Sequence, residues 1–132
     1  MIQILTERAF PIRELRLLAS GRSAGVSVSI EGRSYPVAEA TADAFEGVEI
    51  ALFSAGSDVS TELAPLAVSR GATVIDNSNA WRMDPAVPLV VSQVNPDDAA
   101  QHEGIIANPN CSTMQLAPVL MALRDAAGLE RV

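Results

Sequence analysis

Cys111 carries the most specific chemical signal in this sequence, in which it is the only cysteine among 132 residues. It follows a strand-like segment and the turn Asn108–Pro109–Asn110, and a helix is expected from Cys111 or Ser112 to about Ala127. The unpaired N–H groups and the dipole at a helix N-terminus favour an anion, so they favour a thiolate nucleophile at this position. A buried structural cysteine is the alternative that position alone leaves open.

Arg82 is the second candidate, and it lies in a polar segment that follows another predicted strand. A lone arginine in a loop is commonly an ion-pair partner at the surface. Its planar guanidinium also has the right shape to bind a phosphate or a carboxylate. All nine basic residues are arginine, so a Schiff-base lysine and a P-loop lysine are excluded within this chain.

The composition excludes several classes of function. A net charge of −7 without clusters of basic residues argues against nucleic acid and against an anionic membrane surface as partners. A single cysteine excludes an internal disulfide and a CxxC metal site, and the single histidine, His102, excludes a histidine-rich one, so we expect no metal. No segment has the length of an apolar membrane span or signal peptide, and the expected location is the cytoplasm.

The segments alternate between strand and helix, which is typical of an α/β fold with a parallel sheet and flanking helices. A short helix is expected around residues 2–9, and a hairpin joins residues 26–30 to 33–37. Further helices are expected at 59–70, with Ser57 or Asp58 as N-cap and Gly71 after its end, and at 96–102. The expected buried strands are residues 15–19, 48–53, 73–75, 89–91 and 104–107, and residues 129–132 resemble the start of another.

Polar loops follow four of these strands, and they begin at Ser20, Ser54, Asn77 and Asn108. Ligands of parallel α/β sheets bind at the carboxyl ends of the strands, so all four loops are candidate site loops. No GxGxxG fingerprint of a dinucleotide-binding turn is present in the sequence.

The loop after residues 15–19 bears on the choice of cofactor. An acidic residue at the corresponding point of a dinucleotide fold selects NAD, whereas an arginine accommodates the 2′-phosphate of NADP. Residues 15–28 contain no Asp or Glu, and Ser20, Arg22 and Ser23 offer hydroxyls and a guanidinium. This pattern favours NADP, and an ordinary polar turn is the alternative. The small residues Ser54, Ala55 and Gly56 would let a nucleotide approach the backbone closely.

Four segments of the chain resemble bacterial aspartate-semialdehyde dehydrogenases, in order and at the spacing of that family. They are Leu17–Leu18–Ala19–Ser20–Gly21–Arg22–Ser23–Ala24–Gly25, Ala51–Leu52–Phe53–Ser54–Ala55–Gly56, Val74–Ile75–Asp76–Asn77–Ser78–Asn79–Ala80–Trp81–Arg82–Met83–Asp84–Pro85 and Asn108–Pro109–Asn110–Cys111–Ser112–Thr113. The sister reductase of N-acetyl-glutamyl phosphate shares the fold, but its motifs around the cysteine and the arginine differ. It is the alternative enzyme.

The resemblance implies an NADP-dependent enzyme of lysine, threonine and methionine biosynthesis. It would interconvert L-aspartate 4-semialdehyde and phosphate with L-4-aspartyl phosphate through a thioester on Cys111. The resemblance implies that Arg82 binds phosphate, that Asn110 orients the substrate and that Asn77 contacts the nicotinamide or the substrate. His102 lies in the acidic stretch 97–103 and is expected to be a solvated surface residue, because the histidine base of the family lies elsewhere.

The resemblance also implies an incomplete Rossmann-type sheet, because the family's first strand and glycine turn precede the residue that matches Met1. Residues 1–107 would be a partial NADP-binding domain, and residues 108–132 the active-site cysteine loop and the start of the catalytic domain. The full-length enzyme would be a homodimer. As a central fragment, the chain is expected to be inactive alone, and a non-catalytic nucleotide-binding remnant is the alternative from another functional class.

Overall fold

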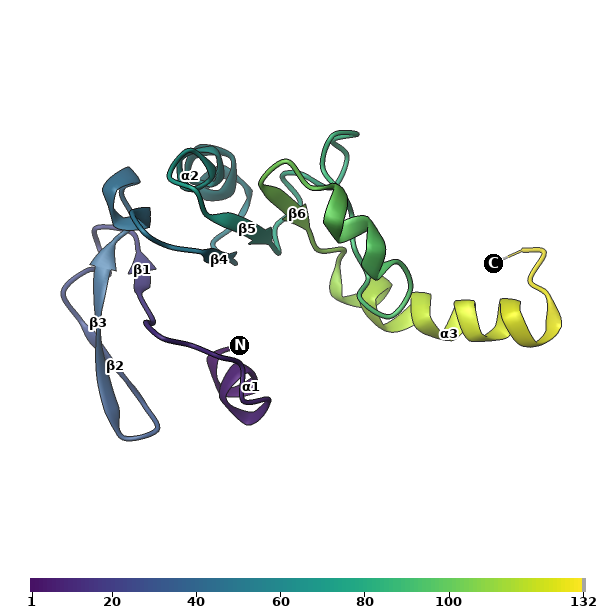
Figure 1. Cartoon of the computed structure of the whole chain (residues 1–132), viewed down its shortest axis with the longest axis horizontal. Helices are drawn as coiled ribbons and strands as arrows, with labels where there is room; N and C mark the ends of the chain where they lie inside the picture. The colour runs from purple at the N-terminus through teal and green to yellow at the C-terminus, as the bar shows by residue number, and fades with distance from the viewer. Residues whose placement is uncertain (132) are drawn as a thin grey trace. The chain divides into compact units, whose positions relative to one another are not determined.

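The computed structural model describes residues 1–131. The chain divides into two compact units, Met1–Ala44 and Phe45–Val132, and each unit has its own three-stranded sheet (Figure 1). The predicted α/β class, with parallel strands and flanking helices, is confirmed. Within residues 1–131, no helix is both long and apolar enough to cross a membrane.

The first unit contains one short helix and a small mixed sheet with the strand order β1-β3-β2. The elements are α1 (Ile2–Glu7), β1 (Leu17–Ala19), β2 (Ser27–Ile30) and β3 (Arg33–Glu39), and the 3₁₀ helix η1 (Ala42–Phe45) follows. The predicted hairpin is confirmed, with β2 antiparallel to β3. Its turn residues Glu31 and Gly32 have φ values of 49° and 77°, as a tight two-residue turn requires.

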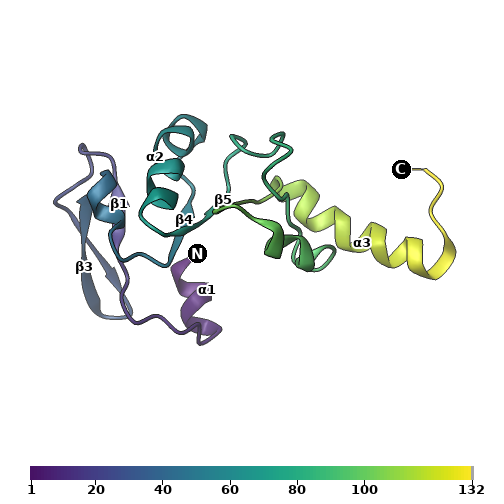
Figure 2. The ribbon, with the colours of Figure 1, turned by 45° about the horizontal axis from the view of Figure 1, so that its top comes forward.

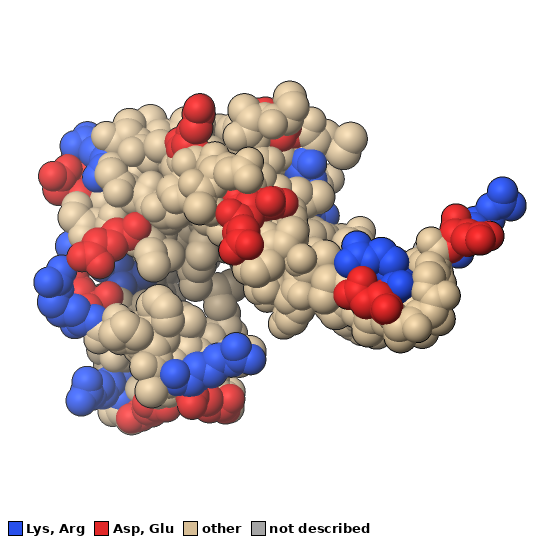
Figure 3. Space-filling model, turned by 45° about the vertical axis from the view of Figure 1, so that its right-hand side comes forward, with Lys and Arg blue, Asp and Glu red and all other residues tan. Residues whose placement is uncertain are grey.

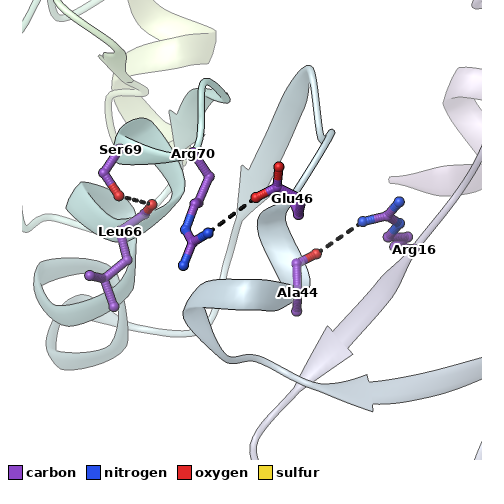
Figure 4. Close-up of polar contacts among 6 residues, drawn as sticks. All are labelled: Arg16, Ala44, Glu46, Leu66, Ser69 and Arg70. Atoms are coloured by element: carbon purple, nitrogen blue, oxygen red, sulfur yellow. Dashed lines mark hydrogen bonds and ion pairs between the residues drawn. The ribbon is translucent and has the colours of Figure 1, made fainter.

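Strand β1 is shorter than predicted, because it begins at Leu17 rather than at residue 15. The two preceding charged residues pair with each other: Arg16 Nε donates to Glu14 Oε1 at 2.6 Å, and this contact lowers the pKa of the Glu14 carboxyl. Arg16 Nη1 also donates to the carbonyl oxygen of Ala44 at 3.3 Å (Figure 4). These side-chain contacts lie just before the segment that pairs with β3.

The second unit contains a fully parallel sheet with the order β4-β5-β6. Its elements are β4 (Ile50–Phe53), α2 (Ser57–Ser69), β5 (Thr73–Asp76), the 3₁₀ helix η2 (Pro96–Gln101), β6 (Ile105–Ala107) and α3 (Cys111–Ala127). Helix α2 covers one face of β4 and β5 (Figure 2). Its alanines Ala64 and Ala67 are completely buried, and their small side chains allow the helix to pack closely against the sheet.

Strand β4 is buried on one face only, which corrects the prediction of a buried strand over residues 48–53. Ala51 and Phe53 are buried, and the ring of Phe53 stacks on that of Phe45 with centroids 5.9 Å apart. Ile50 and Leu52 point to the other face and are 47% and 40% exposed. The alternation follows from strand geometry, because successive side chains point to opposite faces.

The N-terminal end of α2 differs from the prediction, and its C-terminal end agrees with it. Gly56, with φ 91°, is the N-cap, and Ser57 is already the first helical residue, so the prediction of Ser57 or Asp58 as N-cap is wrong. The predicted role of Gly71 is confirmed by its φ of 90° just after the C-cap residue. In the last turn, Ser69 Oγ donates to the carbonyl oxygen of Leu66 at 2.7 Å, and Arg70 pairs with Glu46 at 3.1 Å (Figure 4).

Three other segments differ from their predictions. Residues 89–91 form no strand, because their pairing with β6 is limited to a single bridge between Leu89 and Ala107. The predicted helix at 96–102 is a 3₁₀ helix that ends at Gln101. Residues 129–131 are not a strand, and Val132 lies outside the described residues.

Helix α3 confirms the prediction of a long helix that begins at Cys111 and is followed by Gly128. Pro118 lies inside the helix without ending it. None of its residues is buried, and Leu116, Val119 and Leu123 are each 50–55% exposed. Figure 3 shows one face of the molecule, on which blue and red groups are scattered among larger tan areas.

Candidate functional site

Three of the four predicted site loops start at the same edge of the parallel sheet in the second unit. The last residues of the strands are in register, with Phe53 beside Asp76 and Asp76 beside Ala107. Backbone hydrogen bonds continue one residue further, from Asn77 N to the Phe53 oxygen at 2.9 Å and from Asn108 N to the Asp76 oxygen at 2.8 Å. The loops that follow β4, β5 and β6 therefore begin side by side, as expected for the carboxyl ends of parallel strands.

Cys111 is the first residue of α3, and its side chain is exposed. The N–H groups of Cys111 and Ser112 have no acceptor within the helix, because hydrogen bonding to the preceding turn begins later. They lie at the positive end of the dipole of a 17-residue helix. The predicted position of the cysteine at the start of this helix is confirmed.

Asn110 is the N-cap of α3, and its side chain makes the cap. Its Oδ1 accepts a hydrogen bond from the N–H of Thr113 at 2.8 Å. The amide oxygen of Asn110 is therefore occupied by the helix cap. The Nδ2 group keeps two donors, and the side chain is exposed directly before Cys111.

Arg82 links the loop after β5 to the loop that leads to Cys111. Its Nε donates to the carbonyl oxygen of Asn108 at 2.7 Å, and its Nη2 donates to the carbonyl oxygen of Asn77 at 3.1 Å. These bonds use two of the five N–H donors of a guanidinium. Across residues 1–131 the other three make no hydrogen bond, so a half-buried cation presents open donors near the Cys111 loop.

The loop after β4 consists of Ser54, Ala55 and Gly56, and all three residues are exposed. A Cβ atom on Gly56 would meet open space, so its positive φ, and not crowding, requires glycine there. The next residue, Ser57, donates through Oγ to Oδ1 of Asn79 in the neighbouring loop. The loops after β4 and β5 are thus joined directly.

The fourth predicted loop belongs to the first unit and turns tightly after β1. The N–H groups of Ser23 and Ala24 both donate to the carbonyl oxygen of Ser20, at 2.8 and 3.1 Å. Ser20, Arg22 and Ser23 are all exposed, so their hydroxyls and guanidinium are accessible to a ligand.

Glu39 contributes a carboxylate to this loop that the local sequence did not reveal. A Cβ atom placed on Gly21 would lie 2.7 Å from Oε1 of Glu39, so the carboxylate lies directly against the loop. Pairing of Ala19 with Glu39 in the parallel β1–β3 ladder brings it there. Residues 15–28 contain no Asp or Glu, but the Glu39 carboxylate still lies against the loop that carries Arg22.

His102 is half-buried, which corrects the expectation of a fully solvated side chain. Its Nδ1 accepts a hydrogen bond from the N–H of Gly104 at 2.9 Å, so it stabilises the turn before β6. Among the residues that the structure describes, no group of three histidine, cysteine or acidic side chains is placed to hold a metal.

An open hollow of about 770 Å³ lies elsewhere, in the first unit, between α1 and the β2–β3 hairpin. None of the residues predicted to bind cofactor or substrate lines it. The hollow therefore belongs neither to the loops at the edge of the parallel sheet nor to the loop after β1.

Comparison with known proteins identifies the family. A family described as "Semialdehyde dehydrogenase, NAD binding domain" matches residues 1–102. The chain belongs to the semialdehyde dehydrogenase family. Its NAD-binding domain therefore accounts for most of the residues, and the predicted resemblance is confirmed.

Individual relatives agree with this assignment. The aspartate-semialdehyde dehydrogenase of Bacillus subtilis is 54% identical over 132 residues, which cover 100% of this chain and 38% of the relative. Aspartate semialdehyde dehydrogenase II from Vibrio cholerae, solved in complex with ASA, has a TM-score of 0.92 and 45% identity over 98% of this chain and 43% of its own. The enzyme from Candida albicans, solved with NADP, has a TM-score of 0.73 and 26% identity, covering 96% of this chain and 43% of its own.

The chain thus spans about two fifths of the length of the relatives it matches. It corresponds to the N-terminal portion of aspartate-semialdehyde dehydrogenases and carries a region that binds NAD or NADP in the family.

Proposed function

We propose that this chain supplies the cofactor-binding region and the nucleophile of an NADP-dependent aspartate-semialdehyde dehydrogenase. The observation that carries the proposal is the hydrogen bond from Arg82 to the Asn108 carbonyl, because it holds a cation on the loop that leads to Cys111. A thiol nucleophile beside a phosphate-binding cation suits the interconversion of a semialdehyde and an acyl phosphate. The Vibrio cholerae relative, solved with ASA, supports the choice of substrate.

In the proposed reaction, the Cys111 thiolate attacks the aldehyde carbon of L-aspartate 4-semialdehyde, and the carbonyl electron pair moves to oxygen. The N–H groups at the start of α3 and the Nδ2 group of Asn110 donate hydrogen bonds to that oxygen. Bound NADP⁺ supplies the acceptor for the hydride that leaves the same carbon. The oxygen electron pair then re-forms the carbonyl, and the product on the enzyme is a Cys111 thioester.

Arg82 acts in the second half of the proposed reaction. Its three open N–H donors hold inorganic phosphate beside the thioester. A phosphate oxygen attacks the carbonyl carbon, the C–S bond breaks with its electron pair on sulfur, and one phosphate proton is released. The products are L-4-aspartyl phosphate and the restored Cys111 thiolate, and biosynthesis runs the sequence in reverse.

The loop that follows β1 carries exposed polar side chains whose charge and accessibility suit an NADP 2′-phosphate. In the proposal, the exposed guanidinium of Arg22 and the hydroxyls of Ser20 and Ser23 bind this phosphate. In the second unit, Ser54, Ala55 and Gly56 allow the nucleotide to approach, and Asn77 contacts the nicotinamide or the substrate. The Candida albicans relative, solved with NADP, supports this cofactor.

Three further assignments belong to the same proposal. Residues 1–107 bind the cofactor, and residues 108–132 begin the catalytic part. The enzyme that contains this chain is a homodimer, and it works in the cytoplasm.

A chimera tests the proposed function. The chain replaces the corresponding segment of the Bacillus subtilis relative, to which it is 54% identical throughout. We expect phosphate-dependent formation of NADPH from aspartate semialdehyde, and no turnover with Cys111→Ser. A folded chimera that turns over only N-acetyl-glutamate semialdehyde would favour the sister reductase, and one without any turnover would favour a non-catalytic remnant.

A further inference from the structure

A completely buried carboxylate, that of Asp76, immediately precedes the loop that carries Arg82. Asp76 ends β5 and has no exposed surface, and its partners Ser60 and Ser78 are 1% and 8% exposed. Burying a carboxylate is costly unless several donors satisfy its oxygens. Asp76 therefore needs an explanation that the proposed chemistry, in which it has no part, does not supply.

One oxygen of Asp76 reaches toward helix α2. Ser60 Oγ donates to Asp76 Oδ1 at 2.8 Å, and the same hydroxyl accepts a hydrogen bond from Trp81 Nε1 at 2.9 Å. The hydroxyl has one proton to give and gives it to the carboxylate, so its lone pair is open to the indole. The indole next to Arg82 is thus tied to the buried carboxylate through a single serine.

The other oxygen of Asp76 organises the start of the loop. The N–H of Ser78 and its Oγ both donate to Asp76 Oδ2, at 3.1 and 2.6 Å. Ser78 Oγ in turn accepts a hydrogen bond from the N–H of Ala80 at 3.1 Å. Residues 78, 80 and 81 are therefore each connected to one carboxylate by at most one intervening hydroxyl.

We infer that Asp76 is a positioning residue that sets the loop 77–82 and thereby holds the Arg82 guanidinium against the Asn108 carbonyl near Cys111. The inference rests on the proposed function only for the statement that Arg82 binds phosphate. The geometry itself is complete without a ligand, because Arg82 follows Trp81 directly and donates to the carbonyls of Asn77 and Asn108. An arginine aligned in this way keeps three donors in one place for an anion.

The pattern of donors explains why an acidic residue suits this position. The Ser78 N–H cannot become an acceptor, so the group opposite it must accept. An asparagine could turn its oxygen to Ser78 and donate with its amide to Ser60 Oγ, which would keep part of the network. An alanine would leave the buried donors of Ser60 and Ser78 without an acceptor. The two substitutions are therefore expected to differ in severity.

The test measures hydrogen exchange of the Arg82 Nε–H by NMR in the 132-residue chain without ligand. Trp81 is the only tryptophan in the chain, so its indole N–H signal reports on the Ser60 contact without ambiguity. In Asp76→Ala, we expect exchange of the Arg82 Nε–H to become at least about tenfold faster and the Trp81 signal to shift. Asp76→Asn should restore part of the protection.

Two controls separate positioning from general stability. Asp97→Ala removes an exposed carboxylate and should change neither signal. The amide of Val74, which donates to the Gly104 carbonyl at 2.8 Å in the middle of the sheet, should keep its exchange rate in the variants. If Asp76→Ala does not fold, the same exchange measurement is made on Ser78→Ala. This variant removes one hydroxyl of the network and leaves the Asp76 carboxylate in place. Ser78→Thr keeps the hydroxyl and should restore the protection.

Faster exchange at Arg82 with unchanged exchange at Val74 would support the inference. Unchanged exchange at Arg82, or equal acceleration at both positions, would overturn it. Titration of each folded variant with inorganic phosphate is a separate measurement on the Arg82 signals. If exchange of the Arg82 Nε–H depends on Asp76 but the Arg82 signals do not respond to phosphate, the positioning role of Asp76 stands. The proposed role of Arg82 in phosphate binding is then contradicted.

Discussion

The Nε atom of Arg82 donates a hydrogen bond of 2.7 Å to the carbonyl oxygen of Asn108, three residues before Cys111. This bond joins the loops that follow β5 and β6, so the candidate cation and the candidate nucleophile are carried by connected parts of the backbone. The remaining donors of Arg82 stay available, and the side chain is only partly shielded from water. The candidate cation and the candidate nucleophile therefore both lie at the edge of the parallel sheet.

Replacing Arg82 should specifically weaken the use of phosphate. In the active chimera, Arg82→Gln removes a charge-assisted contact of about 1.5–3 kcal/mol, so the KM for phosphate should rise about ten- to one-hundred-and-fortyfold. Arg124→Gln, which alters an exposed arginine paired with Asp125, is the matched control and should change it little. An unchanged phosphate KM for Arg82→Gln would remove the arginine from the proposed mechanism.

Cys111 should react faster than an unperturbed thiol. At neutral pH, labelling by iodoacetamide should exceed that of a model peptide about two- to fivefold, because the positive end of the α3 dipole favours the negative charge in the transition state of alkylation. The chain has one cysteine, so the label reports on Cys111 alone. Labelling at the rate of the peptide would show that the helix terminus does not activate it.

Arg22 should discriminate between the two nicotinamide cofactors. Arg22→Gln removes the group proposed to bind the 2′-phosphate, so NADPH affinity in the chimera should fall about ten- to one-hundredfold while NADH affinity changes little. Fluorescence titration measures both affinities. Arg33→Gln alters an exposed arginine at the hairpin turn and serves as the control. Equal losses for NADPH and NADH would show that another residue reads the 2′-phosphate.

Glu39 should oppose the binding of NADP. Its carboxylate lies against Gly21, next to Arg22 in the chain, and would repel a 2′-phosphate bound to this loop as proposed. Glu39→Gln should therefore strengthen NADPH binding about two- to fivefold relative to NADH, and the gain should shrink at high salt. If Glu39→Gln leaves the preference for NADPH over NADH unchanged at low salt, the 2′-phosphate binds away from this carboxylate.

Gly104 should tolerate no side chain. A Cβ atom there would lie 2.4 Å from Cγ1 of Val68, and its φ is 112°. Gly104→Ala is expected to lower the free energy of unfolding by about 2–4 kcal/mol through overlap and backbone strain, as measured by urea denaturation. Gly71→Ala, at φ 90° in open space, should cost only the strain, about 1–2 kcal/mol.

The overlap can be removed separately from the strain. In a background of Val68→Ala, the additional cost of Gly104→Ala should fall toward that of Gly71→Ala, because the two methyl groups that collide are absent. A cost that remains the same in this background would assign the whole effect to φ.

Local patterns were enough to predict most elements of this chain. The start of α3 at Cys111, the glycine after α2 and the β2–β3 hairpin depend on caps, turn residues and periodicity within a few positions. Predictions of strand and helix boundaries fail for the same reason, because they too use only local patterns. The apolar segment around Leu89 predicts a strand, but pairing there stops after one bridge, because it depends on a partner far along the chain.

The α/β class, the loops that carry the candidate residues and the position of Cys111 at a helix N-terminus all follow from local sequence patterns, because short-range hydrogen bonding and hydrophobic periodicity govern these features. Which side chains meet depends on the tertiary fold. The β1–β3 register brings Glu39 to Gly21, and the β5–β6 register brings Arg82 to Asn108 and puts Asp76 beneath its loop. Such contacts join residues that are far apart in the chain, and sheet register, which no local window contains, selects them.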